Sequence, residues 1–307
     1  MRPLETENLH CLRAREGDIL RESGQRKGIA MATVAGKLDD TRIGGGQSGS
    51  PVVRAIDRWI YVGMAAWFIL IVLGGFVPDS IFKIEALRAG LRPPFPPILH
   101  IHALTMGALL LLLLAQALFM ATGQRERHYA FGRAMFILAP AIFVVWLILV
   151  PTVYQLYWAA AQTAPLAARP KLHAFSLALN DIFLGQLRIG TLFPLYIFMG
   201  LRARRTDPEF HKRMMILALA TTLAPALARM WWLPKPFQSE LMSRDFYTVL
   251  IILPMFLWDV VRTHGIPKAY LVWAGFYALI SIPVYALAGT PWWHSTVEHL
   301  MGVSPEA

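Results

Sequence analysis

The chain has 307 residues, of which 56% are hydrophobic, and a formal net charge of +10 at pH 7. A soluble domain is only about 45–50% apolar, so this composition excludes an ordinary soluble protein and indicates an integral membrane protein. The basic residues lie mostly in short turns between apolar runs, so the charge reflects membrane topology and does not indicate nucleic-acid binding. The single cysteine, Cys11, excludes an internal disulfide, an iron–sulfur cluster and a covalently attached haem.

Residues 1–52 form a polar tail that we expect to be disordered. The tail ends in the glycine-rich segment GGGQSGS at residues 44–50, which has the composition of a flexible linker. Met31 offers an alternative start, so residues 1–30 are a candidate for a segment that is not translated. The tail lacks the short apolar segment and cleavage site of a signal peptide, so we expect no cleavage there.

The rest of the chain predicts an all-α integral membrane bundle over residues 53–290, followed by an outer C-terminal tail over residues 291–307. Seven apolar runs are mostly long enough, as helices, to cross about 30 Å of hydrocarbon. The sixth run is the shortest, so any error in the count is expected there. The runs cover residues 60–77, 98–121, 134–154, 173–201, 214–233, 246–261 and 270–288.

The distribution of basic residues predicts the orientation in the membrane. From Met31 on, most lysines and arginines fall on one side if the N-terminus is cytoplasmic and the seven runs alternate in direction. Because cytoplasmic loops carry the excess of positive charge, we expect the N-terminus inside and the C-terminus outside. The expected location is the inner, cytoplasmic membrane of a bacterium, with the lipid bilayer as the principal contact.

Two turns on the predicted cytoplasmic side resemble each other. Each follows a Phe-Met pair, contains arginines and one histidine, and leads to Ala-Pro-Ala, at residues 139–141 and 224–226. The similarity suggests that residues 98–154 and 173–233 form an internal repeat. Independent convergence on basic turns explains the similarity equally well.

Five histidines lie at the ends of the predicted helices. His100, His102 and His173 open helices from the outside, whereas His128 and His211 lie in solvated turns on the inside. A haem b without covalent attachment needs two neutral imidazoles at similar depth on neighbouring helices. His102 with His173, and His128 with His211, meet this requirement; since helix positions turn by about 100°, His100 is the alternative to His102. Each histidine also has an ordinary reading as an interfacial residue that reaches lipid headgroups or water.

Residues 98–230 resemble the ascorbate-reducible two-haem b-type cytochromes. The resemblance depends on His102, on RERH at residues 125–128 and on FGR at residues 131–133, and it is closer to uncharacterised bacterial multi-helix membrane proteins that share these features. The cytochrome resemblance implies four core helices that bind one haem near each face through histidines on alternate helices.

The fourth run contains polar residues that are costly in lipid. An unpaired ion there costs about 2.5–3.5 kcal/mol on insertion scales, so partners are expected. We expect Asp181 to pair with Arg229, with Arg188 as a competitor. Such a cluster is suited to a haem propionate, a quinone carbonyl, a proton or an anion, or it is a structural clamp between helices. The predicted cluster comprises Gln116, Asn180, Asp181, Arg188 and Arg229.

These features leave three functions to weigh. The first is a haem-binding electron carrier with His102 and His173 as iron ligands and a quinone or a protein as electron partner. The second is a non-catalytic subunit or assembly factor of a larger membrane protein complex, and the third is an ion or proton transporter. No phosphate-binding loop, zinc motif or nucleophile elbow supports a hydrolase.

Overall fold

The structure of the chain is a computed structural model that describes residues 50–163 and 169–303, with side chains in the second range from Ala174 on. The chain divides into residues 1–57 and residues 58–307, and the arrangement given below concerns the second unit. Nearly all of the predicted tail over residues 1–52 therefore lies outside the described residues.

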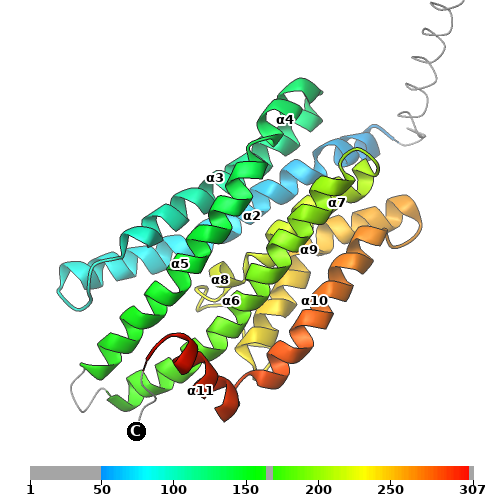
Figure 1. The fold of residues 1–307 in the computed structure, drawn as a ribbon. Helices are drawn as coiled ribbons and strands as arrows, with labels where there is room; N and C mark the ends of the chain where they lie inside the picture. Colours follow the sequence, from blue (N-terminus) through cyan, green and yellow to red (C-terminus); the bar gives the residue numbers. More distant parts are fainter. Residues whose placement is uncertain (1–49, 164–168, 304–307) are drawn as a thin grey trace, which may run out of the picture. The chain divides into compact units, whose positions relative to one another are not determined.

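All regular structure in the described residues is helical, which confirms the all-α prediction. The long helices follow one another through short turns, and short helices lie between or after them (Figure 1). The helices are α2 (Pro51–Arg88), α3 (Pro97–Ala121), α4 (Arg125–Gly132), α5 (Met135–Gln162), α6 (Arg169–Ala203), α7 (Pro208–Thr221), α8 (Ala224–Leu227), α9 (Glu240–Thr263), α10 (Lys268–Leu287) and α11 (Pro291–Leu300).

Six helical segments among the described residues are long and apolar enough to cross a membrane: α2, α3, α4 with α5, α6, α9 and α10. These segments expose large apolar side chains such as Leu104, Ile137 and Leu279, which suits contact with lipid. By helix length and hydropathy, the chain is therefore a multi-pass membrane protein. The prediction of seven long spanning helices is wrong by one.

The error lies in the fifth run, residues 214–233, and not in the sixth. This run is divided between α7 and the single turn of α8, and the chain continues without a helix to Ser239. Pro225 lacks an N–H and its ring crowds the carbonyl group four residues earlier, and α7 ends at that residue, Thr221. The sixth run becomes a full candidate span because α9 already begins at Glu240, where the Ser239 hydroxyl accepts a hydrogen bond from the Met242 N–H at 3.4 Å.

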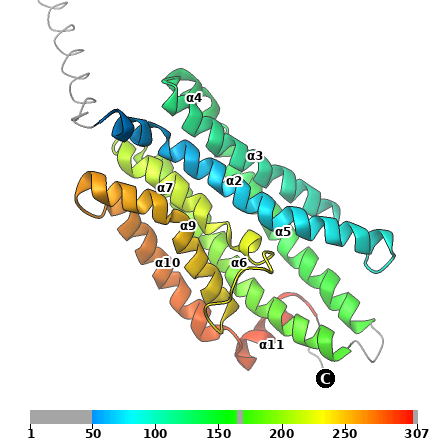
Figure 2. The same cartoon turned by 180° about the vertical axis from the view of Figure 1, so that it is seen from behind.

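Helix α7 lies at the centre of the packing and is almost wholly buried from Phe210 to Thr221. It packs against α6, α9 and α10, while α5 packs against both α3 and α6. The α3–α4, α6–α7 and α9–α10 turns lie at one end of this unit, which we call the α4 end. The α2–α3 turn and α11 lie at the opposite end, the α11 end (Figures 1 and 2).

The broken segment around α8 is held against α2. Gly75 on α2 lies so close to the Ala226 carbonyl group that a Cβ at this position would collide with the backbone of α8. The side chain of Met230 lies beside Gly74, one residue earlier. Non-helical backbone inside a membrane is tolerated where protein covers it, and this close contact supplies such cover.

The predicted outer tail contains a helix that is attached to the bundle. In α11, the Thr290 hydroxyl caps the first turn by accepting from the Trp293 N–H at 3.2 Å. The Trp293 indole N–H donates to the Asn180 carbonyl oxygen on α6 at 2.8 Å, and Gln155 on α5 donates to the Met301 carbonyl oxygen at 3.1 Å. Residues 291–301 are thus part of the folded unit.

Candidate functional site

The first group of candidate residues lies at the α4 end, where α4 packs against α3. The side-chain amide of Gln116 on α3, with its nitrogen turned toward His128 on α4, donates to the His128 carbonyl oxygen at 3.0 Å and to Nδ1 at 2.6 Å. The amide oxygen accepts from the Gly132 N–H at 3.1 Å. His128 is therefore half-buried and bonded to a neighbouring helix, and does not lie in the solvated turn that the sequence predicts.

His211, on the first turn of α7, is held in a similar way. Its Nδ1 lies 2.8 Å from the carbonyl oxygen of Gly200 near the end of α6. A carbonyl oxygen only accepts hydrogen bonds, so Nδ1 carries the proton of the neutral ring and Nε2 keeps its lone pair. The imidazole interacts electrostatically with His128 and with Arg204. Both histidines that the sequence assigns to the cytoplasmic side thus lie at the α4 end, within electrostatic range of each other.

The histidines at the α11 end are placed differently. The Nδ1 of His102 is buried without a hydrogen-bond partner among the described residues, and the ring lies within electrostatic range of Arg229. His100 is exposed and meets the Phe95 ring edge-on, with centroids 6.2 Å apart. His173 lies near the start of α6, where side chains are outside the described residues. The predicted pair of His102 and His173 therefore stays a prediction.

A second polar group surrounds Arg188 inside the bundle. Arg188 is 2% exposed and forms two 2.6 Å bonds with the Asp245 carboxylate on α9, while its Nη1 also donates to the Ser281 hydroxyl on α10 at 2.9 Å. Two tyrosines on α10 donate to the same carboxylate, Tyr277 at 2.6 Å and Tyr285 through a short bond. The ion pair is therefore almost completely bonded, and it joins α6, α9 and α10.

The predicted pair of Asp181 and Arg229 is wrong. Asp181 accepts from the Gly289 N–H at 2.8 Å, beside α11. Arg229 donates to Asp79 on α2 at 3.1 Å and lies over the Phe76 ring, with 4.4 Å from the guanidinium carbon to the centroid. The prediction assumed a continuous fifth helix beside α6, whereas the chain after α8 turns toward α2 and takes Arg229 with it.

Asn180 and Gln116, the two remaining residues of the predicted cluster, lie in different parts of the bundle. Asn180 is fully buried, accepts from the Tyr154 hydroxyl at 2.6 Å, and its amide nitrogen lies 3.0 Å from the His294 Nδ1 on α11. Gln116 lies at the α4 end, with His128. The five residues thus belong to separate groups and do not form one site.

A second buried ion pair lies at the α4 end, next to His211 in the sequence. Arg213 on α7 forms two 2.8 Å bonds with the Asp259 carboxylate on α9, and a third bond of 2.6 Å with Glu209. The Tyr270 hydroxyl donates to Asp259 at 2.7 Å. These bonds attach the first turns of α7, which carry His211, to both α9 and α10.

Sequence reasoning missed the partners of the two buried arginines. Asp245 directly precedes the predicted sixth run, which begins at residue 246, and its two tyrosine partners lie within the seventh run, at residues 270–288. A signal was present, because Tyr277, Ser281 and Tyr285 recur every four residues on α10 and so share one helical face.

No group of three or more His, Cys, Asp and Glu side chains within residues 50–163 and 174–303 could hold a metal ion. The two imidazoles at the α4 end therefore have no third ligand of these types beside them within the described residues. In comparisons with known proteins, no family model, no curated protein and no solved structure matches the chain.

Proposed function

We propose that the chain is a membrane-embedded electron carrier that holds one haem b between His128 and His211 at the α4 end. The observation that carries the proposal is the position of these two imidazoles at one end of the bundle, within electrostatic range of each other and each bonded at Nδ1 to a neighbouring segment. The proposal includes a finer location, the bacterial cytoplasmic membrane, and the charge distribution supports an orientation with the α4 end on the cytoplasmic side.

His211 suits the group as it stands, whereas His128 suits it only after a change of hydrogen bonding. An imidazole that ligates a metal through Nε2 commonly donates its Nδ1 proton to a carbonyl oxygen, as His211 does to Gly200. The His128 Nδ1 accepts from the Gln116 amide, so ligation through Nε2 would require the ring proton on Nδ1 and the amide oxygen turned toward it, which gives up the amide's bonds to the His128 carbonyl oxygen and the Gly132 N–H. Arg204 supplies a positive charge beside His211 for a propionate group.

A haem held by two histidines would supply one-electron transfer. The chain's own residues would restrain the two rings, and Arg204 would offer a positive charge to a propionate group. The proposal concerns one haem, and it differs in this from the cytochrome resemblance, which implies a second haem between His102 and His173.

The two alternatives have less support. The broken segment of α7 and α8 resembles the discontinuous helices of transporters. At this break, however, Ala226 packs directly against Gly75, and the buried Arg188 and Arg213 are already paired with carboxylates, so neither feature offers a site for a transported ion. A non-catalytic subunit of a larger membrane complex fits any bundle with exposed apolar helices, and no contact among the described residues favours it over an electron carrier.

The test is an absorption spectrum of protein purified from haem-replete cells. We expect a Soret band and an α band that shift and sharpen on dithionite reduction. His211→Ala should abolish the spectrum, and His100→Ala, which changes an exposed ring, should leave it intact. Size-exclusion elution as a single peak controls for folding of both variants. A colourless wild-type preparation would contradict the proposal.

A further inference from the structure

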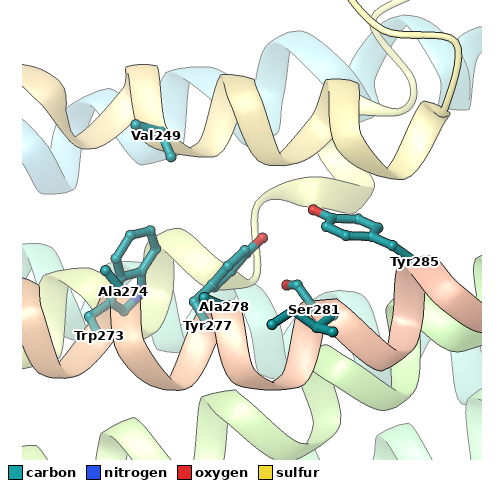
Figure 3. A pocket seen from close by; sticks show the side chains of 8 residues that line it. Val249, Trp273, Ala274, Tyr277, Ala278, Ser281 and Tyr285 are labelled. Carbon is teal, nitrogen blue, oxygen red and sulfur yellow. The ribbon is translucent and has the colours of Figure 1, made fainter.

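A pocket lies between α9 and α10, and its lining includes the two tyrosines and the serine that bond to the Arg188–Asp245 ion pair. It has a volume of about 310 Å³, within the range of about 300–1,000 Å³ for small-molecule sites. Figure 3 shows that the rings of Tyr277 and Tyr285 rise from α10 toward the helix that carries Val249, with Ser281 between them along α10. The lining is otherwise apolar and includes Trp273.

The pocket opens sideways. Ala274, Ala278 and Ile282 line it and are exposed at the surface of α10, and Val249 is 47% exposed on α9. Because α9 and α10 are both candidate spans, this opening faces the lipid. The small side chains of Ala274 and Ala278 leave the opening wide, so an occupant enters from the bilayer and must itself be apolar.

One hydrogen-bond donor in the pocket is uncommitted. The Trp273 N–H donates to Thr221 at 3.1 Å, and the hydroxyl groups of Tyr277 and Tyr285 donate to Asp245. Ser281, which is 3% exposed, accepts from Arg188 at 2.9 Å, but its own O–H donates to no acceptor within the described part of the chain. The bond from a buried cation polarises this O–H and makes it a stronger donor.

These features select the chemistry of the occupant. A lipid acyl chain fills an apolar groove but leaves the Ser281 O–H without an acceptor, which is unfavourable in a buried site. A flat ring stacks against aromatic side chains, and a carbonyl oxygen on that ring accepts from Ser281. We propose that the pocket between α9 and α10 binds the ring of a membrane quinone, with one carbonyl oxygen bonded to the Ser281 hydroxyl.

The choice of a quinone rests on the proposed electron-transfer function, because such a carrier needs a lipid-soluble partner. Binding is nevertheless independent of haem and is measured separately. The protein in phosphatidylcholine nanodiscs is irradiated with a photoreactive azidoquinone, with and without decylubiquinone as competitor, and the labelled peptides are identified by mass spectrometry. Lipid is in large excess in the nanodisc, so an acyl-chain groove would give no saturable labelling.

We expect saturable labelling of residues 268–287 that decylubiquinone suppresses. Ala278→Phe fills the opening and should abolish the labelling, whereas Leu279→Phe, at an exposed neighbouring position that does not line the pocket, should preserve it. Ser281→Ala removes the donor and should weaken decylubiquinone binding about tenfold, the effect of one hydrogen bond. Ser281→Thr retains the hydroxyl and should restore most of the affinity.

Two results would overturn the inference: labelling that decylubiquinone does not suppress, or equal labelling of Ala278→Phe and wild type. The haem spectrum of the same samples separates this failure from that of the proposed function. Protein with a haem spectrum and no quinone labelling loses only the pocket assignment, and labelled protein without haem loses only the electron carrier.

Discussion

At the α4 end, each histidine is bonded to a neighbouring segment, His128 to Gln116 and His211 to Gly200. At the α11 end, His100 is exposed and the Nδ1 of His102 is buried without a partner among the described residues. The sequence pattern is the same at both ends, a histidine near the start of an apolar run. The difference arises in the turns, because the tight turn at Gly123 (φ +77°) returns the chain to α3, whereas the α2–α3 connection contains extended, proline-rich backbone.

The ion pairs at the two ends differ as the histidines do: the pair at the α4 end is more buried and has more hydrogen bonds. At the α4 end, the Arg213 and Asp259 side chains are 8% and 7% exposed and share two bonds. Toward the α11 end, the Arg229 and Asp79 side chains are 32% and 22% exposed and share one. Removing one partner of a buried pair leaves an uncompensated charge in the interior, whereas an exposed partner is solvated by water, so the α4 end should respond more strongly to substitution.

The largest effect is expected when the buried pair is broken. Asp259→Ala leaves the buried Arg213 with Glu209 as its remaining carboxylate, and should lower the free energy of unfolding by about 3–5 kcal/mol. Asp79→Ala is the matched change at the half-exposed pair and should cost about 1 kcal/mol or less. Both are measured by unfolding the protein with sodium dodecyl sulfate in mixed micelles. Equal losses would break the comparison of the two ends.

A second prediction compares two glutamines. Gln116→Leu removes the group that restrains His128, and should lower haem affinity by about 10–100-fold, the usual effect of losing an outer partner of a metal ligand. Gln155→Leu removes a bond to the Met301 carbonyl oxygen near α11 and should leave haem affinity unchanged. Haem titration into apoprotein, followed at the Soret band, measures both. Retention of wild-type affinity in Gln116→Leu would show that the amide does not support the ligand.

The smallest effect concerns the turn between α6 and α7. The Asp207 carboxylate caps α7 by accepting from the Phe210 N–H at 2.9 Å, and it accepts from Lys268 at 2.5 Å. Asp207→Ala loses both contacts and should cost about 1 kcal/mol, the usual value of an N-cap. Asp207→Asn keeps the cap and loses only the charge, so it should cost less. Thermal unfolding of the two variants separates cap from charge, and equal midpoints would contradict the assignment of the cap.

The same residue gives a pH dependence. The bond from Lys268, followed by the bond from the Phe210 N–H, holds the pKa of Asp207 below its ordinary value. A lowered carboxyl pKa stabilises the fold above the pKa of the unfolded chain, about 3.9, and this contribution disappears as the pH falls through the folded value. The stability difference between wild type and Asp207→Asn should therefore shrink below about pH 4. A difference that grows on acidification would contradict the sign.

Hydropathy predicted most of the fold because each long helix carries enough apolar residues to identify it. It missed the break at α8 because proline alone is not a reliable stop: Pro140, Pro151, Pro194 and Pro254 all lie inside helices of this chain. The outcome depends on packing against Gly75, which no local pattern contains.

The candidate site was predicted only in part. His128, His211 and Gln116 were named from the sequence, since histidines and a glutamine stand out near apolar runs. The partners of Arg188 and Arg229 could not be predicted, because the pairing of buried ions depends on which helices are neighbours. The Asp181 prediction was wrong for this reason, because the path of the chain after α8 was not known.

The central claim is that the α4 end, and not the α11 end, holds the haem. The most direct measurement is the ratio of haem to protein, by the pyridine haemochrome assay, in His128→Ala and His102→Ala purified side by side. The account predicts almost no haem in His128→Ala and the wild-type ratio in His102→Ala. A wild-type ratio in His128→Ala, with haem lost from His102→Ala, would contradict it.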